Sequence, residues 1–166
     1  MKVNNVKCTL KSSHPIFEGK LKNNKKYKIN FGNTTLIIYG HSPLLINMTG
    51  LKSMEEVDTT RKYIEMAYNV KCSDLKVDSI FYSHKDCLNI DMNALYYYVR
   101  DHYKAQFYID YNIELFPGIY MKSKIKGIPT LILFRTGSYT ILGCKSIEMV
   151  IKYKTFVCNT LKSFYK

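Results

Sequence analysis

The chain has 166 residues, of which 46% are hydrophobic and 14% aromatic, which is enough to bury one continuous core and excludes a disordered chain. Its formal charge of +12 indicates a polyanionic partner, because clustered lysines neutralise phosphates and release their counterions. The five cysteines form no Cys-x-x-Cys pair, which excludes a zinc ribbon and a disulfide framework, and no apolar run reaches the roughly 18 residues of a membrane span.

The first half of the chain is expected to begin with a strand, followed by a short helical or turn segment and a meander of short strands. One strand of this meander is TLIIY at residues 35–39. A long helix closes the half and begins after Ser53, a residue type that caps helix N-termini.

The second half follows the same order with clearer signals. A final helix begins after Ser146 and runs toward Phe164, because apolar residues recur on one of its faces. The elements expected before it are a strand over Leu75–Tyr82, a helix over Asp91–Gln106, and strands over Ile119–Ile125, Thr130–Arg135 and Tyr139–Leu142, the last three separated by Gly127 and Gly137.

An internal repeat decides the architecture. GLKSMEEV at residues 50–57 returns as GCKSIEMV at residues 143–150, 93 positions later, with five of eight residues identical. TLIIY returns as TLILF at residues 130–134, and IFEG at residues 16–19 parallels LFPG at residues 115–118. Residues 1–72 and 73–166 are therefore predicted to be two repeats of one continuous domain.

Two such repeats predict an α+β fold. Their antiparallel strands can join into one curved sheet, a duplicated saddle, with the two long helices on its convex face. The concave face is then left open, and it carries aromatic residues among basic ones. An exposed sheet face of this composition needs a partner.

At this point the residues resemble a known family. ELFPGIYMKSKIKGIPTLILFRTGSYTILGCKSIEMV at residues 114–150 resembles the second repeat of the TATA-box-binding protein family, residues 34–57 resemble its first repeat, and Val3–Thr9 resembles its leading strand. The helical part of the first copy is shortened to little more than Lys11–Pro15. The resemblance implies a transcription initiation factor that binds the minor groove of AT-rich promoter DNA and bends it with aromatic wedges, together with a B-type initiation factor and the RNA polymerase machinery as partners.

The resemblance also implies roles for individual residues. The wedge pairs would be Phe17 with Tyr39 in the first copy and Phe116 with Phe134 in the second. The centre of the saddle is read by an Asn and a Thr from each copy, which donate hydrogen bonds to the acceptors of A·T pairs. The corresponding residues are Asn5 and Thr49 in the first copy and Ser79 and Leu142 in the second.

The second copy therefore lacks both base-reading residue types, and Lys7 and Phe81 fall on the same strand faces as Asn5 and Ser79. We expect a lopsided or relaxed sequence preference. By the same resemblance, Glu114 and Leu115 would dock the B-type factor. The expected phosphate contacts are Lys20, Lys22, Lys25, Lys26, Lys28, Lys122, Lys124 and Lys126.

Alternative roles remain open for these residues. Phe116 and Phe134 could pack in the core, the lysines could form a solvated hairpin, and Asn5 and Thr49 could be polar edge residues. The rival functions are a saddle-shaped interaction subunit of a transcription complex that has lost sequence-specific DNA binding, and an accessory module of a nucleic-acid enzyme whose catalytic residues lie on another chain.

The sequence predicts no catalytic, metal or cofactor site, no membrane association and no small-molecule substrate. His84, Asp86 and Cys87 lie close together, but a catalytic Cys and His are generally brought together by the fold rather than by adjacency. Neither His14 nor the pair Asp101 and His102 has metal-ligand spacing. The expected location is the nucleus, or a cytoplasmic viral factory if the gene is viral.

Overall fold

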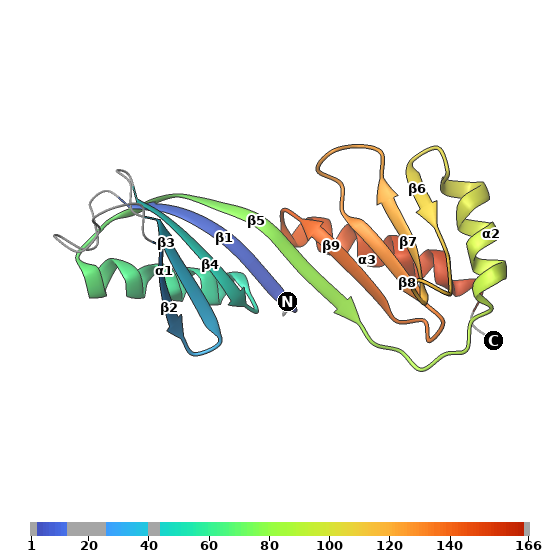
Figure 1. The fold of residues 1–166 in the computed structure, drawn as a ribbon, viewed down its shortest axis with the longest axis horizontal. Helices are drawn as coiled ribbons and strands as arrows, with labels where there is room; N and C mark the ends of the chain where they lie inside the picture. The colour runs from blue at the N-terminus through green and yellow to red at the C-terminus, as the bar shows by residue number, and fades with distance from the viewer. Residues whose placement is uncertain (1–2, 13–25, 40–43, 165–166) are drawn as a thin grey trace. The chain divides into compact units, whose positions relative to one another are not determined.

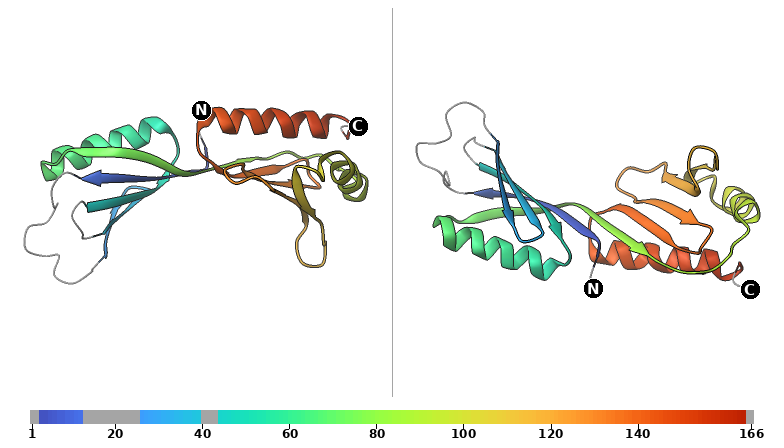
Figure 2. Two further views of the ribbon diagram at one scale, coloured as in Figure 1. Left: turned by 90° about the horizontal axis from the view of Figure 1, so that it is seen from above. Right: turned by 60° about the horizontal axis from the view of Figure 1, so that its bottom comes forward.

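The computed structural model describes residues 3–12, 26–39 and 44–164. The chain forms two compact units, which divide after Ile80. In each unit, a long helix covers one face of the strands (Figures 1 and 2). We call the other side of the strands the open face of that unit. The sequence suggested a boundary between residues 72 and 73, which is the start of the strand that passes from one unit into the other.

The first unit is an antiparallel meander closed by a helix. Its strand order is β2-β3-β4-β1-β5, and β1 pairs with β4, β2 with β3, and β3 with β4, all antiparallel. The elements are β1 (Asn5–Ser12), β2 (Lys26–Phe31), β3 (Thr34–Tyr39), β4 (Leu44–Leu51), α1 (Met54–Tyr68) and the beginning of β5 (Cys72–His84).

Strand alternation builds the core of the first unit. Every second residue of β1 and β3 is buried, as are Ile46, Met48 and Leu51 of β4, and α1 contributes Val57, Thr60 and Ile64 to the core. The helix begins where the sequence predicted, because the Ser53 hydroxyl accepts the Glu56 N–H at 3.2 Å. The Glu56 carboxylate in turn accepts the Lys52 N–H at 2.7 Å. The first bond satisfies an N–H of the first helical turn, which has no acceptor within the helix, and the second fixes the residue just before the cap.

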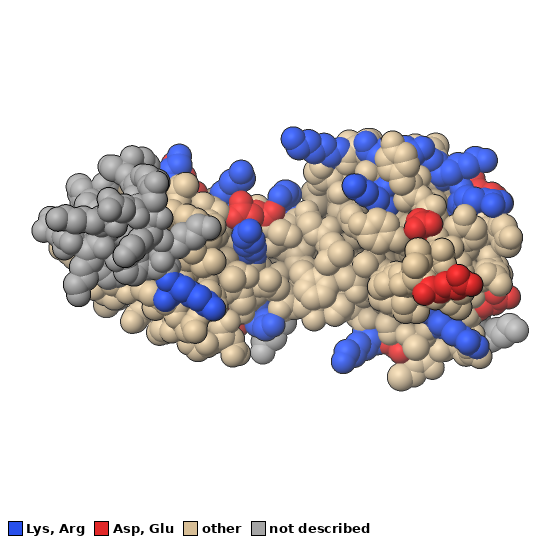
Figure 3. All heavy atoms as spheres, viewed as in Figure 1, with Lys and Arg blue, Asp and Glu red and all other residues tan. Residues whose placement is uncertain are grey.

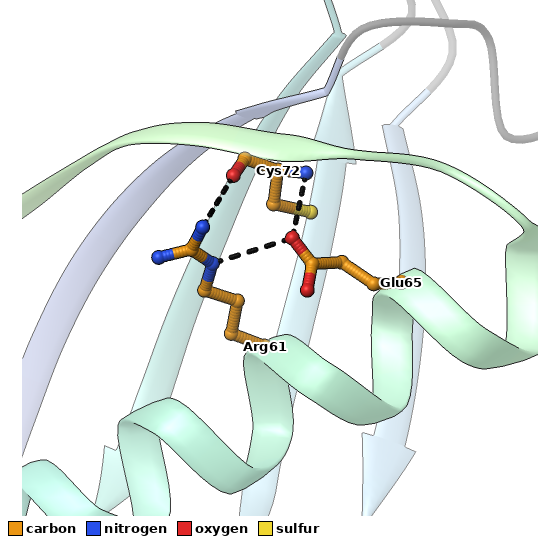
Figure 4. A network of polar contacts seen from close by, with 3 residues as sticks. All are labelled: Arg61, Glu65 and Cys72. Carbon is orange, nitrogen blue, oxygen red and sulfur yellow. Dashed lines mark hydrogen bonds and ion pairs between the residues drawn. The ribbon is translucent and has the colours of Figure 1, made fainter.

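The last turns of α1 are tied to the start of β5 by three polar groups (Figure 4). Glu65 accepts the backbone N–H of Cys72 at 2.9 Å and an N–H of Arg61 at 3.4 Å, and Arg61 donates to the Cys72 carbonyl at 2.8 Å. The Cys72 N–H and the Arg61 guanidinium hold the pKa of the Glu65 carboxyl below its usual value.

This network predicts a pH-dependent contribution to stability. Because the pKa of Glu65 is lower in the folded protein than in the unfolded one, its contribution is present above the unfolded pKa and is lost as the pH falls through the folded pKa. Glu65→Gln should remove this dependence yet keep an acceptor for the Cys72 N–H. Glu65→Ala, which removes the acceptor, should cost about 1–2 kcal/mol of unfolding free energy. Urea unfolding of both variants between pH 3 and pH 7 checks this, and identical pH profiles for wild type and Glu65→Gln would contradict it.

The second unit repeats the plan and adds a helix, α2, and an edge strand, β6, that have no counterpart among the described residues of the first unit. Its strand order is β5-β9-β8-β7-β6, where β5 contributes its last residues. The elements are α2 (Met92–Tyr103), β6 (Phe107–Asp110), β7 (Gly118–Ser123), β8 (Thr130–Phe134), β9 (Tyr139–Cys144) and α3 (Ile147–Lys162). The buried residues of α3 include Val150, Val157 and Leu161, and α2 lies beside β6 (Figure 1).

Most of the expected elements appear, with shifted ends. Ser146 caps α3 by accepting the Met149 N–H at 3.2 Å, and Asp91 caps α2 rather than belonging to it. The short strand β6 was not expected. The helical segment expected over Lys11–Pro15 is wrong for its first two residues, since Lys11 and Ser12 continue β1 opposite Leu45 and Leu44. The rest of that segment lies outside the described residues. None of the three helices in the described part of the chain is long and apolar enough to cross a membrane.

Candidate nucleic-acid interface

The open face of the second unit carries a pair of phenylalanine rings. Phe134 ends β8, and Phe116 lies two residues before β7. The two rings meet edge to face, with centroids 5.9 Å apart. Phe116 is 41% exposed, and Phe134 is half-buried. Leu133 and Leu131, which alternate with the outward residues of β8, are the ones buried in the core. Ordinary core packing is therefore not the role of this ring pair.

A glycine makes room for the rings. Gly118 lies opposite Phe134 in the β7–β8 ladder. A Cβ added to Gly118 would come within 2.9 Å of the Phe116 ring, 3.0 Å of the Phe134 ring and 2.9 Å of the Ile132 side chain. Gly118, the glycine of the LFPG segment, has no side chain, and both rings therefore lie directly over its backbone.

Of the wedge pair expected in the first unit, only Tyr39 lies within the described residues. Tyr39 ends β3 on the open face, half-buried, opposite Lys26 of β2. Phe17 lies outside the described residues, so its pairing with Tyr39 stays a prediction. Gly118 occupies the place in the second unit that Lys26 takes in the first, because both face the last residue of the neighbouring strand.

Asn5 and Thr49 are brought together on the open face of the first unit. The Asn5 side-chain oxygen accepts the backbone N–H of Gly50 at 2.8 Å, and its amide nitrogen lies 3.3 Å from the Thr49 hydroxyl oxygen. The Gly50 N–H therefore sets which way the Asn5 amide points. The oxygen is used within the protein, and the NH₂ group, with two hydrogens, is presented beside the Thr49 hydroxyl.

The counterparts in the second copy differ as the sequence indicated. Ser79 and Leu142 are both half-buried, and Leu142 lies on the open face opposite Thr130. Leu142 brings no hydrogen-bonding group. Lys7 is exposed on β1 between the buried Val6 and Cys8, as expected from strand alternation, and Phe81 is half-buried on β5.

A second polar cluster on the first unit was not predicted. The Thr9 hydroxyl lies 2.8 Å from the Asn47 side-chain oxygen and also contacts the Asp78 carboxylate. Beneath it, burial raises the pKa of the Cys8 thiol to about 11, and the carboxylates of Asp78 and Asp58 add to the shift. Asp78 comes from a different strand, so no local spacing in the sequence connects it to Thr9.

The predicted phosphate contacts divide by location. Lys28 is exposed on β2, while Lys122 and Lys126 are exposed on β7 and the β7–β8 connection. The Lys124 ammonium donates to the Lys104 carbonyl at 2.6 Å and lies 5.2 Å from the Tyr108 ring centroid. Basic side chains gather along this edge of the second unit (Figure 3). Lys26 begins β2, and Lys20, Lys22 and Lys25 lie outside the described residues.

The predicted partner contacts, Glu114 and Leu115, are exposed in the connection between β6 and β7. Leu115 is 83% exposed, the largest exposed fraction among the leucines described as exposed. The Glu114 backbone N–H donates to the Asn112 side-chain oxygen at 3.1 Å, and the N–H groups of Leu115 and Phe116 donate to the Asn112 carbonyl. One residue, Asn112, therefore shapes the loop that presents both the partner contacts and the first ring.

The histidines and the cysteine that could suggest a catalytic site either pack against aromatic rings or are exposed, where the structure describes them. The His84 ring packs against Tyr139 with centroids 5.1 Å apart, and Cys87 is exposed in the segment after β5. The His102 ring stacks on Tyr98 at 4.2 Å. His14 lies outside the described residues. Within the described ranges, no cluster of three or more potential ligand side chains could hold a metal ion.

Comparison with known proteins shows similarity both to a protein family and to solved structures. The model of the family described as "Transcription factor TFIID (or TATA-binding protein, TBP)" matches residues 74–164, more than half of the chain. A solved structure of Methanococcus jannaschii TBP matches with a TM-score of 0.69 at 18% identity, covering 98% of both chains. Comparison with curated protein sequences finds no match. The structural match confirms the fold class expected from the repeats.

Proposed function

Because the chain belongs to the TATA-binding protein family of transcription factors, we propose that it binds promoter DNA in the minor groove and bends it with aromatic wedges. The observation that carries this proposal is the ring pair Phe116 and Phe134, which stands on the open face of the second unit over Gly118. Apolar wedges between base steps unstack them and kink the duplex, and the bend brings more protein surface to the DNA.

The charge of the chain supports a phosphate-bearing ligand. Exposed lysines lie on β7 and on the β7–β8 connection of the unit that carries the ring pair. The whole chain carries 25 Lys and Arg against 13 Asp and Glu. If about six phosphates are neutralised, the logarithm of the binding constant should fall with the logarithm of salt concentration at a slope of roughly −5. Salt dependence therefore reports how many of these contacts form.

Base reading is proposed to be lopsided. The first unit presents the NH₂ group of Asn5 and the hydroxyl of Thr49, both donors that match the A·T acceptors of the minor groove. Leu142 offers no such donor in the second unit. We propose that A·T preference comes mainly from the first unit, and that the strongest bend comes from the second.

Asn5→Asp tests the base-reading role. The carboxylate can still accept the Gly50 N–H, but it replaces the donor NH₂ group with an acceptor. Affinity for an AT-rich duplex should fall about tenfold or more, and affinity for a GC-rich duplex should fall less, because guanine places an amino donor in the minor groove. Fluorescence anisotropy with both duplexes measures this. Asn47→Asp, which adds the same charge on the same face, is the matched control, and equal losses for both variants would contradict a reading role.

The decisive experiment is a titration of AT-rich and GC-rich duplexes at several salt concentrations. Salt-dependent binding with a preference for the AT-rich duplex supports the proposal. Absent or salt-insensitive binding would leave the alternative, a saddle-fold interaction subunit that has lost DNA binding. We also propose that exposed Leu115, with Glu114, docks a B-type initiation factor and through it the RNA polymerase. The proposed location is where promoters are transcribed, which is the nucleus, or a cytoplasmic factory for a viral gene.

A further inference from the structure

A hollow of about 210 Å³ opens beside the ring pair on the second unit. It is too small for a drug-sized ligand, which occupies roughly 300–1,000 Å³, and large enough for one planar ring. It lies between the loop that carries Phe116 and the outer strands β6 and β7. Its lining residues are Asp110, Asn112, Leu115, Phe116, Gly118 and Tyr120.

Two aromatic rings line this hollow. Tyr120 follows Gly118 by two residues, so both lie on the open face of β7, and Tyr120 is 38% exposed. Phe116 rests over Gly118 and is 41% exposed. Gly118 also lines the hollow and adds no side chain to it. Exposed rings around a gap of this size are suited to stacking on a planar heterocycle.

The remaining lining residues supply both kinds of hydrogen-bonding group. The Asn112 side-chain oxygen accepts the Glu114 N–H at 3.1 Å, which leaves the amide nitrogen as its donor toward a ligand. Asp110 ends β6 directly opposite Tyr120 and adds a carboxylate acceptor. The Watson–Crick edge of each nucleobase carries a donor next to an acceptor, which this pair of residues can complement without selecting one base.

Positive charge continues along the same strand. Lys122 is the next outward residue of β7 after Tyr120, and it lies opposite Tyr108 of β6, which is 64% exposed. Lys124 holds its ammonium 5.2 Å from the Tyr108 ring centroid. Alternating aromatic and basic side chains are the pattern by which single-stranded nucleic acid is bound, with bases on the rings and phosphates on the lysines.

The first unit does not repeat this arrangement. Lys28 faces Ile37 in the first unit, as Tyr120 faces Ile132 in the second, and Ile37 and Ile132 are equivalent residues of the repeated strand. The position of Tyr120 is therefore a lysine in the other copy. Within the described residues, the ring at this strand position is found in the second repeat and not in the first, so it is not a requirement of the shared fold.

We propose that this hollow binds one unpaired base of single-stranded DNA, stacked between Phe116 and Tyr120, with the flanking phosphate near Lys122. This binding goes beyond the proposed grip on duplex DNA, with which it shares Phe116. Asp110 and Asn112 hold the edge of the base. Stacking is tolerant of sequence, so the site accepts any base.

Binding of a labelled twelve-residue oligothymidine, measured by fluorescence anisotropy, tests the proposal on the full chain. The reference ligand is an abasic oligomer of the same length and charge. Wild type should prefer the oligothymidine by about tenfold or more, and Tyr120→Ala should lower its affinity about 5- to 100-fold and remove most of that preference. Tyr120→Phe, which keeps the ring, should stay within about twofold of wild type, as should Tyr97→Ala, which removes an exposed ring from α2.

The base site is overturned if wild type binds the two oligomers equally, or if Tyr120→Ala binds oligothymidine as tightly as wild type does. A protein side chain would then be the occupant to consider. Thermal unfolding of each variant verifies its fold. Phe134→Ala separates this proposal from duplex binding, because Phe134 does not line the hollow. It should reduce duplex bending while oligothymidine binding is retained. Tyr120-dependent binding without any duplex binding would support the base site and refute the proposed function.

Discussion

Replacing both Phe116 and Phe134 by alanine is expected to remove most of the duplex bend and to lower duplex affinity about 30- to 1,000-fold. Each ring is assigned about 1–2 kcal/mol of stacking on a base, and 1.4 kcal/mol corresponds to a factor of ten in binding. The bend should be lost with the affinity, because unstacked base steps are what permit the kink. Energy transfer between fluorophores at the two ends of a duplex measures the bend, and anisotropy measures the affinity.

The fold should survive this double substitution. Phe116 is exposed, Phe134 is half-buried, and the two rings contact each other over Gly118 on the open face. The melting temperature should therefore change little compared with truncation of a buried residue such as Leu133. Tyr97→Ala is the control for loss of an exposed ring away from the open face. A double variant that still bends DNA to the wild-type angle would show that the rings are not wedges, even if the chain binds DNA.

Gly50→Ala is expected to destabilise the protein by about 3–5 kcal/mol, and Gly143→Ala, at the equivalent position of the other repeat, by only about 1–3 kcal/mol. Both glycines have a positive φ, +93° and +89°, so both alanines meet the same backbone strain. The added Cβ at Gly50 would also overlap the carbonyl oxygen of Asn33, and it would lie 3.1 Å from the Asn33 carbonyl carbon and 3.3 Å from the Thr34 Cα. Among the described residues, apart from the two chain neighbours, no heavy atom lies within 4 Å of a Cβ added to Gly143.

The repeat thus supplies its own control. Both variants have the same backbone strain. The difference between their losses of unfolding free energy therefore measures the overlap with the Asn33 backbone, which cannot move aside as a side chain would. Urea unfolding followed by circular dichroism measures both free energies. Equal losses would show that the hairpin at Asn33 yields to the methyl group. The Gly50 variant should also lose A·T preference, because the Gly50 N–H orients the Asn5 amide.

The fold was predictable because its strongest signal is internal. The repeated strand-to-helix junction predicts both long helices, and Ser53 and Ser146 are their capping residues, as predicted. Element ends were less predictable. Asp91 was counted as helical because a capping residue directly precedes the first turn, and β6 was missed because four residues give too short a pattern. Lys11 and Ser12 were assigned to a helical segment, yet pairing with β4 keeps them extended.

Candidate site residues could be named from the sequence only where a motif carries them. The family resemblance implied Phe116 and Phe134, whereas the contact of both rings with Gly118 depends on which strands lie side by side. Tyr120 and Tyr108 could have been found by reading the alternation of β7 and β6, since Ile119 and Met121 are the buried neighbours of Tyr120. The contact of Thr9 with Asp78 joins residues 69 positions apart, and no local spacing reports it.

The cysteines described earlier make the two units separately observable. Cys8 and Cys72 are buried in the first unit and Cys144 in the second, and burial raises the pKa of each of these thiols, to about 11 for Cys8 and Cys144. Only a thiol that becomes exposed and ionised reacts readily with a disulfide reagent. With exposed Cys87 and half-buried Cys158 first substituted, the modification rates of the three buried thiols report local opening of each unit. A duplex that binds both units should lower the modification rates of all three buried thiols. A ligand that binds only the second unit should lower the rate of Cys144 alone.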